Sequence, residues 1–207
     1  MPFLKALYLN GKIKTGVTHA DAYGQFSSKE RNQTDQIISG FLNEQTGEFT
    51  DPYSDKSFYA KEIILIRHGS VKDGDNPDPD LSQQGRQEVE RIAYYLRKQV
   101  DLRDYQAYVS PSLRCIRSAE IIAYNTRIGF VVDPQIQQQD SETLETFENK
   151  LKNAIDVLPS KSLVISHSPI IQGMVELAIG SFVRSPIPTG SLTIINKKQT
   201  ICIGFKY

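Results

Sequence analysis

Hydrophobic and polar positions follow two regular periods from residue 62 to the end of the chain. Short apolar runs rich in Ile, Val and Leu predict buried strands, and longer segments with an apolar position every three or four residues predict amphipathic helices. The predicted strands cover residues 62–66, 106–110, 129–132, 162–166, 191–196 and 200–205, and the predicted helices cover 82–99, 112–125, 141–157 and 169–179. This alternation predicts an α/β fold of three layers, a mainly parallel sheet with helices on both faces. The last two strands, joined by residues 196–198, form a hairpin that closes one edge of the sheet.

The first 60 residues have a different pattern. Residues 7–14 predict a hairpin with an Asn10-Gly11 turn, and residues 35–42 predict a short helix. The stretch between residues 19 and 60 is too polar for a core of its own, but its aromatic side chains can pack on the main domain. We therefore divide the chain into an N-terminal extension, residues 1–60, and a main domain, residues 61–207.

The composition of the chain argues against several classes of function. The chain has 207 residues, with 24 basic and 24 acidic residues and a formal net charge of zero, which argues against a nucleic-acid partner and against a polybasic membrane anchor. No run of 18 apolar residues predicts a membrane span, and the N-terminus lacks the pattern of a signal peptide. Two cysteines make no disulfide framework. A cytoplasmic location is therefore expected, and the oligomeric state is not predicted.

Two of the buried strands end in a histidine. The run of residues 63–66 leads into Arg67-His68-Gly69, and the run of residues 163–165 leads into Ser166-His167-Ser168. In an open α/β sheet, ligands bind at the carboxyl ends of the strands. The chain has three histidines, and the third, His19, lies in no such motif and is expected to be a surface or structural residue.

Two further motifs lie between these strand ends. Residues 80–87 read Asp-Leu-Ser-Gln-Gln-Gly-Arg-Gln, in which Ser82 is a suitable N-cap for the next helix. Residues 109–120 read Val-Ser-Pro-Ser-Leu-Arg-Cys-Ile-Arg-Ser-Ala-Glu, another strand end that runs into a helix and carries Arg114.

With these four motifs in this order, the chain resembles the histidine phosphatase superfamily, whose fold is that of phosphoglycerate mutase. The resemblance covers roughly residues 62–205. The family pattern is Arg-His-Gly, then Leu-Thr-x-x-Gly, then Ser-Pro-x-x-Arg-x-x-x-Thr-Ala-Glu, then Ser-His. Ser82 and Ser118 stand where the family usually has threonine. The resemblance implies a phosphatase without a metal or other cofactor, and the sequence has no metal-ligand spacing.

The resemblance also implies roles for single residues. His68 matches the nucleophile that becomes phosphorylated, His167 matches the second histidine of the pocket, and Arg67 and Arg114 match the arginines that bind phosphate. The chemistry needs these types, because a neutral imidazole is a good nucleophile and guanidinium groups stay charged and bind phosphate bidentately. Backbone amides near Gly69 and Ser168 are expected to add donors at the helix starts.

The proton donor is where the chain departs from the family. Members usually carry an acid after the third strand, but here the position falls on Gln138, and the residues from Asp140 to Glu142 already resemble the start of the following helix. The substrate loop is therefore shortened, and Ser168 stands where one branch has an aspartate. The candidate acids are Asp75, Asp140 and Glu142. Asp75 lies in a loop with Asp73, Asp78 and Asp80, whose alternative role is to cap polar turns.

Three functions are compatible with this pattern. The first is a phosphatase that forms a phosphohistidine intermediate and acts on a phosphomonoester or a protein phosphohistidine, as in the short branch that resembles protein-phosphohistidine phosphatases. Its partner is a phosphorylated small molecule or a phosphoprotein. The second is a catalytically weak or inactive module that binds a phospho-ligand or a protein. A mutase comes third, because the shortened loop argues against an enclosed site.

Other charged and reactive residues are expected to be structural. Arg117 is expected to be a surface charge and Cys115 a buried helix residue. The charged residues of the 82–99 helix are expected to form a solvated face, in which Glu88 and Glu90 separate Arg86, Arg91, Arg97 and Lys98.

Overall fold

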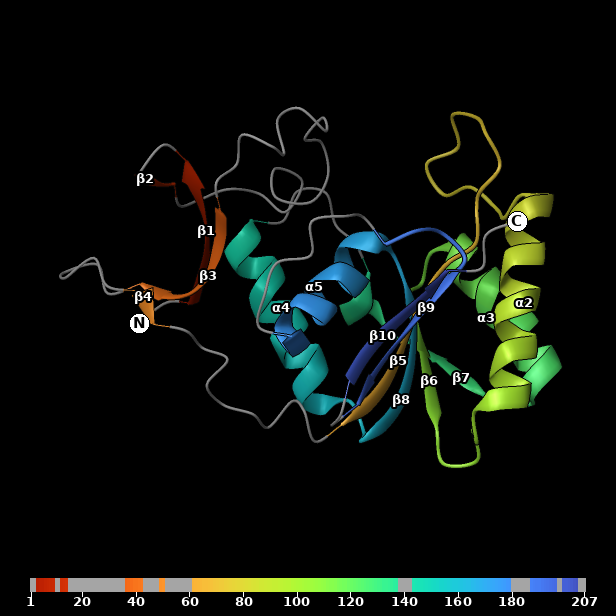
Figure 1. Cartoon of the computed structure of the whole chain (residues 1–207). Coiled ribbons are helices and arrows are strands. Elements are labelled where there is room, and N and C mark those ends of the chain that lie inside the picture. The colour runs from red at the N-terminus through yellow and green to blue at the C-terminus, as the bar shows by residue number, and fades with distance from the viewer. Residues whose placement is uncertain are drawn as a thin grey trace.

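The structure is a computed structural model that describes residues 3–9, 12–14, 36–42, 49–50, 61–137, 143–179, 187–196 and 199–204. The strands are β1 (Phe3–Leu9), β2 (Lys12–Lys14), β3 (Gln36–Leu42), β4 (Phe49–Thr50), β5 (Glu62–Arg67), β6 (Gln106–Val109), β7 (Phe130–Val132), β8 (Lys161–Ser166), β9 (Ser191–Asn196) and β10 (Gln199–Gly204). The helices are α2 (Gln83–Gln99), α3 (Leu113–Thr126), α4 (Leu144–Val157) and α5 (Ser168–Ile179), with a 3-10 turn η4 (Pro134–Ile136). Figure 1 shows their arrangement.

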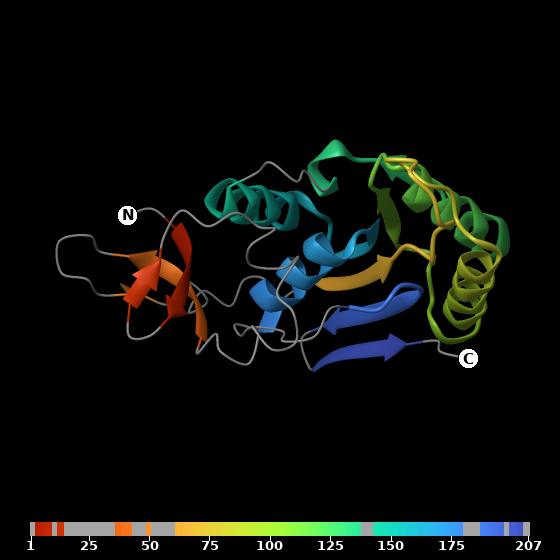
Figure 2. The same ribbon diagram turned by 90° about the horizontal axis from the view of Figure 1, so that it is seen from above.

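Six strands form one mixed sheet in the order β10-β9-β5-β8-β6-β7. The pairs β5–β8, β8–β6 and β6–β7 are parallel, whereas β9 pairs antiparallel with both β5 and β10. Figures 1 and 2 show α2 and α3 on one side of this sheet and α4 and α5 on the other. The predicted fold class, a mainly parallel three-layer α/β domain, is confirmed. The predicted C-terminal hairpin is the β9–β10 pair at one sheet edge, and its residues 197–198 lie outside the described part.

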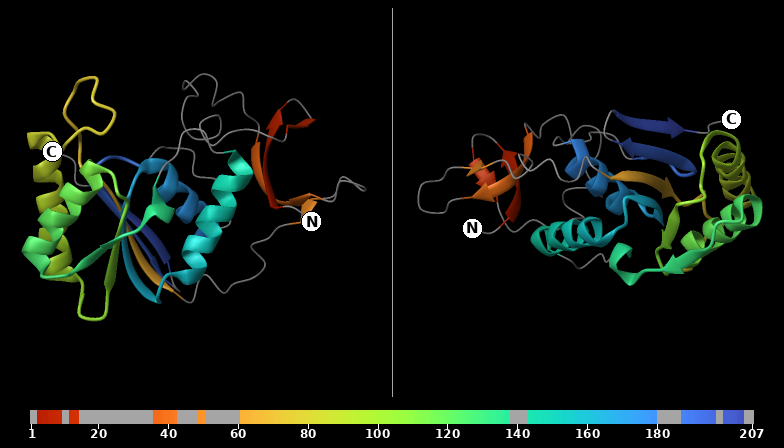
Figure 3. Two further views of the ribbon diagram at one scale, coloured as in Figure 1. Left: turned by 180° about the vertical axis from the view of Figure 1, so that it is seen from behind. Right: turned by 90° about the horizontal axis from the view of Figure 1, so that it is seen from below.

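The central strand β5 divides the core into two halves. Ile63 and Leu65 point toward α4 and α5, whereas Ile64 and Ile66 point toward α2 and α3, and all four are at most 1% exposed. Successive side chains of a strand face opposite sides, so a strand covered on both faces must be apolar at every position. This explains why the sequence of β5 shows a continuous apolar run. Figure 3 shows the two helical layers from behind and from below.

The N-terminal strands form a separate four-stranded sheet in the order β2-β1-β3-β4. The strands β1 and β2 pair antiparallel across residues 10–11, and the predicted Asn10-Gly11 turn itself lies outside the described residues. The helix predicted for residues 35–42 is wrong, because Gln36–Leu42 forms β3, which pairs antiparallel with β1. Adjacent β-branched residues favour a strand, and pairing across the sheet outweighs a weak local helix preference.

Helix starts place the motifs of the main domain. Ser82 is the N-cap of α2, where its hydroxyl accepts a hydrogen bond from the Gly85 amide at 3.0 Å. The α4 helix begins at Leu144, after an N-cap at Thr143, whereas the sequence predicted a start at residue 141; residues 138–142 lie outside the described part. Because β5, β6 and β8 are parallel, the residues that follow them meet at one edge of the sheet.

Candidate active site

Two histidines meet at the carboxyl edge of the sheet. His68 directly follows β5 and His167 directly follows β8, and the last residues of these strands, Arg67 and Ser166, are partners in the parallel register. The two imidazole centroids lie 5.3 Å apart, with the rings inclined at 64°. One phosphoryl group can therefore contact both rings.

A backbone contact fixes the tautomer of His68. Its Nδ1 lies 2.8 Å from the carbonyl oxygen of Gly69, and because a carbonyl oxygen only accepts, Nδ1 carries the proton. The lone pair is then on Nε2. Burial, together with the charges of Arg67 and Arg114, lowers the pKa of His68 to about 4, and the hydrogen bond to the Gly69 carbonyl oxygen opposes this shift. His68 is therefore neutral near pH 7, in the form that can attack a phosphorus atom.

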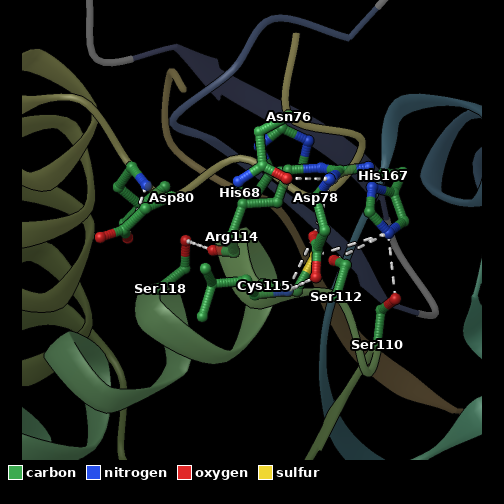
Figure 4. A network of polar contacts seen from close by, with 12 residues as sticks. His68, Asn76, Asp78, Asp80, Ser110, Ser112, Arg114, Cys115, Ser118 and His167 are labelled. Atoms are coloured by element: carbon green, nitrogen blue, oxygen red, sulfur yellow. Dashed lines mark hydrogen bonds and ion pairs between the residues drawn. The ribbon is translucent and has the colours of Figure 1, made fainter. Parts of the chain in front are cut away.

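His167 is a neutral imidazole in a different setting. Its Nε2 lies 3.0 Å from the Ser110 hydroxyl and 3.2 Å from the Ser112 hydroxyl, whereas its buried Nδ1 has no hydrogen-bond partner among the described residues. Burial lowers the pKa of His167 to about 2, with contributions from Arg114, His68 and Arg67. Figure 4 shows the contacts of His167 with the two serines.

The two arginines reach the same region from different elements. Arg67 ends β5 and donates from Nη1 to the carbonyl oxygen of Ile187, while its buried Nε has no partner among the described residues. Burial and the charge of Arg114 lower the pKa of Arg67, and Glu88 opposes this. Arg114 lies in the first turn of α3, where its Nη1 donates to Asp78 at 3.2 Å. The buried Nε–H of Arg67, which has no partner among the described residues, lies near neutral imidazoles and makes this edge a suitable site for an anion.

The backbone amides of Gly69 and Ser168, which were predicted to bind phosphate, have different surroundings in the structure. The Gly69 amide donates to the Ser118 hydroxyl at 3.3 Å, and a Cβ at Gly69 would lie 2.3 Å from the carbonyl oxygen of Gly85. Gly69 therefore allows close packing against the start of α2. Ser168 is the first residue of α5, next to His167. Binding of phosphate by either amide stays a prediction.

The loop between β5 and α2 holds four carboxylates, and two of them have defined partners. Asp78 accepts from the Leu113 amide at 2.9 and 3.0 Å and from Arg114, so it joins the loop to the start of α3. Asp80 accepts from Arg86 and from the Leu81 amide. Asp73 and Asp75 are exposed. The candidate acids Asp140 and Glu142, and also Gln138, lie outside the described residues.

Glu88 is a site neighbour that the sequence analysis missed. The expectation of a solvated face is wrong for this residue, which is 5% exposed. Its carboxylate accepts from the Ser70 amide at 2.8 Å and from the Ser70 hydroxyl, which also contacts Thr189. Gly190, at φ +59°, packs against Glu88, since a Cβ there would lie 2.4 Å from the Glu88 Cβ. The Gly190 amide in turn donates to the His68 carbonyl oxygen at 3.0 Å, so Glu88 supports the backbone around His68.

The helical periodicity of α2 could have predicted that Glu88 is buried. The buried face of α2 consists of Gly85, Glu88, Val89, Ile92, Ala93 and Leu96. A charged residue at a position that the period assigns to the core needs a buried partner, and such a residue marks a polar network.

The remaining expectations concern α3. Cys115 is fully buried, and its Sγ lies 3.7 Å from the His167 Nε2. Burial raises the pKa of the Cys115 thiol to about 11, so the thiol stays protonated near pH 7. The Arg117 side chain is 42% exposed and pairs with Glu120 at 2.8 Å, which fits a surface charge.

No described group of three or more His, Cys, Asp or Glu residues could hold a metal ion. Within the described ranges, no helix combines the length and apolar character that crossing a bilayer requires.

Comparison with known proteins finds a matching family model for part of the chain and solved structures with a similar fold. Residues 63–154 match the sequence model of the histidine phosphatase superfamily, branch 1. A proposed phosphohistidine phosphatase SixA from Agrobacterium tumefaciens has 20% identity and a TM-score of 0.55, over 72% of this chain and 98% of the other. The protein histidine phosphatase SixA solved with tungstate has 19% identity and a TM-score of 0.54, over 69% and 94%. A proposed α-ribazole-5′-phosphate phosphatase from Escherichia coli K-12 has 14% identity and a TM-score of 0.53, over 70% and 95%. No curated protein sequence matches this chain.

Proposed function

The domain that begins at β5 belongs to branch 1 of the histidine phosphatase superfamily, and from this premise we propose that the chain is a phosphatase that works through a phosphohistidine at His68. The observation that carries the proposal is the tautomer of His68. Its Nδ1–H is held by the Gly69 carbonyl oxygen, its ring lies beside the imidazole of His167, and the charges of Arg67 and Arg114 act on it.

The reaction has two displacements at phosphorus. The Nε2 of His68 forms a bond to phosphorus while the bond from phosphorus to the leaving group breaks and the leaving group departs with the electron pair. Water then attacks the phosphohistidine, the P–N bond breaks, and inorganic phosphate and free His68 result. Arg67 and Arg114 stabilise the negative charge on the equatorial oxygens in both steps.

The substrate that fits best has a good leaving group, such as a protein phosphohistidine or an aryl phosphomonoester. Among the described residues, Asp78 accepts hydrogen bonds from the Leu113 amide and from Arg114. Burial opposes ionisation of Asp80, but the Leu81 amide and Arg86 hold the pKa of that carboxyl below its ordinary value. Without a positioned acid, an alkoxide leaves poorly, whereas a phosphorylated imidazole can receive its proton from solvent. The fold shared with SixA agrees with this choice.

A second candidate function rests on the same observation. If no residue supplies a proton and turnover is negligible, the pocket still offers Arg67, Arg114 and His167 to an oxyanion. The chain would then be a module that binds a phospho-ligand or a phosphoprotein.

One experiment separates the two functions. The full chain is incubated with an activated aryl phosphate, and the protein is tested for phosphate that is labile in acid and stable in base. Turnover of phosphohistidine-containing protein and of small phosphomonoesters is measured beside it. An enzyme gives trapped phosphate and turnover, and both are lost in His68→Ala. Binding of inorganic phosphate without trapping or turnover identifies the module, and activity that survives in His68→Ala overturns the assignment of His68.

A further inference from the structure

The two nitrogens of His167 have opposite environments. Three polar side chains surround Nε2, namely Ser110 at 3.0 Å, Ser112 at 3.2 Å and Cys115 at 3.7 Å. Nδ1 is buried and has no partner among the described residues. A buried polar atom without a partner costs free energy, and such an atom in a pocket indicates a ligand that completes its hydrogen bonding.

A neutral imidazole carries one proton, so its two nitrogens have different roles. If Nε2 carries the proton, Nδ1 presents a lone pair to the pocket and repels an anion. If Nδ1 carries it, Nδ1 donates to the anion, and Nε2 must accept from its neighbours. The hydroxyls of Ser110 and Ser112 are donors of the kind that the second arrangement requires.

We propose that Ser110 and Ser112 are positioning residues whose hydroxyls share the single lone pair on Nε2 of His167, one donating at a time, so that the proton stays on Nδ1 and an N–H group is aimed at the phosphoryl oxygens. This inference rests on the proposed function, because only an oxyanion in the pocket requires a donor at this atom. The two histidines of the site are then in the same tautomer, with the proton on Nδ1, but they present different nitrogens to the substrate. His68 presents its unprotonated Nε2 as nucleophile, and His167 presents its protonated Nδ1 as hydrogen-bond donor.

Contacts of the strand ends and of the α3 start determine where both serines lie. Ser110 follows β6, and its amide donates to the Ile165 carbonyl oxygen at 3.0 Å, which fixes it beside the end of β8. Ser112 is the N-cap residue of α3, but its hydroxyl makes no capping bond to the helix. A hydroxyl at an N-cap ordinarily accepts from the helix backbone. Here it is directed to His167, and the Asp78 carboxylate takes the Leu113 amide instead.

The test reads the tautomer directly. The full chain is labelled with ¹⁵N-histidine, and the shifts of both His167 nitrogens are recorded at pH 7 with and without inorganic phosphate. The inference predicts a protonated Nδ1 in the free protein, whose proton signal moves when phosphate binds. A protonated Nε2 in the unmodified protein overturns it, whatever the variants do and whether or not the chain turns over substrate.

Variants then test the two hydroxyls. Ser110→Ala/Ser112→Ala should move the proton of His167 toward Nε2 and weaken the binding of inorganic phosphate about tenfold, as expected for one lost hydrogen bond to a charged group. Ser112→Thr keeps a hydroxyl and should restore part of this loss when combined with Ser110→Ala. Ser162→Ala is the matched control, because Ser162 is as buried as Ser110 but donates to the Pro159 carbonyl oxygen. Equal weakening in Ser162→Ala, or an unchanged tautomer in the double variant, contradicts the proposal.

Discussion

At the scale of single residues, each arginine of the pocket is matched by a carboxylate. Asp78 contacts Arg114 at 3.2 Å, and the charge of Glu88 acts on Arg67. A phosphate dianion therefore meets cations that are already partly neutralised. We therefore expect these carboxylates to weaken the binding of free phosphate, which would favour its release as a product.

Arg114 and Arg117 lie one helical turn apart on α3 and allow a matched comparison. Arg114→Ala should lower kcat/KM on the order of 10²-fold or more, because it removes a fixed cation from the transferred phosphoryl group. Arg117→Ala should change kcat/KM by about twofold at most, since exposed ion pairs such as Arg117–Glu120 contribute little. Steady-state kinetics with an aryl phosphate measures both, and equal losses would contradict the assignment of Arg114.

Gln138, at the position where the family usually has an acid, leads to a prediction about leaving groups. Turnover of aryl phosphates and phosphohistidine should be much faster than turnover of alkyl phosphates, because the departing atom bears its own charge. The measurement is log(kcat/KM) for monoesters with leaving groups of graded pKa, which should give a steep slope. A flat series would reveal a hidden donor. Its identity would be found by replacing the acids of the two candidate segments in turn, namely Asp73, Asp75, Asp78, Asp80, Asp140 and Glu142.

The position of a residue could be predicted where a motif directly follows a strand. The sequence placed Arg67, His68 and His167 at strand ends, and the parallel register then brings the histidines together. It could not show that Asp78 reaches Leu113, because the two are 35 positions apart and their contact depends on how the loop crosses the sheet edge. Glu88 was missed because charge was given more weight than helical period.

At the scale of elements, the position of α2 depends on two glycines. A Cβ at Gly69 would lie 2.3 Å from the Gly85 carbonyl oxygen, and a Cβ at Gly85 would lie 1.9 Å from the Ser70 carbonyl oxygen. The start of α2 therefore packs directly on the backbone beside His68. Ser82 completes the junction, since its amide and its hydroxyl both donate to the Ser70 carbonyl oxygen, at 2.9 and 3.1 Å.

A methyl group added at this junction between α2 and the backbone beside His68 should destabilise the protein. Gly85→Ala should destabilise the protein by about 3 kcal/mol, because the added Cβ meets backbone that can move only with the whole helix. Gly129→Ala is the control, as no atom lies within 4 Å of a Cβ there. Urea unfolding of both variants measures the difference in the free energy of unfolding. Similar stabilities for the two variants would show that α2 can shift at little cost.

The elements themselves were predictable from residue 62 onward because their periods are strong and their ends carry caps. The Ser82 cap and the apolar run of β5 each specify one structure. The prediction for residues 36–42 was wrong because the apolar residues of this segment fit a short helix or a strand equally well. Pairing with β1 makes this segment a strand, and the local sequence pattern does not reveal that pairing.

At the scale of the whole molecule, the two buried histidines make stability depend on pH. The folded-state pKa values, about 4 for His68 and about 2 for His167, lie below the unfolded value of about 6.5. The unfolded chain therefore binds more protons as the pH falls below 6.5, and the free energy of unfolding falls with it. Each histidine should contribute a loss on the order of 2 kcal/mol at pH 5.

Urea unfolding at pH 7, 6 and 5 checks this sign and size. The unmodified protein should lose stability over this interval, and His167→Asn should lose less over the same interval, whatever its stability at pH 7. Stability that is constant between pH 7 and pH 5 would show that the folded and unfolded chains take up protons equally, and that folding does not lower the pKa values of the two histidines.

The strand order has a consequence for the growing chain. β5 pairs with β8 and β9, whose first residues follow the end of β5 by about 95 and 125 positions. While the ribosome adds those residues, the four apolar side chains of β5 that the fold buries have neither neighbouring strand, and both edges of β5 can pair with other chains. The same delay keeps the pocket unassembled, because His167 follows β8 and the segment that accepts from Arg67 precedes β9. Nascent chains that stop before β9 should therefore be both inactive and prone to aggregate.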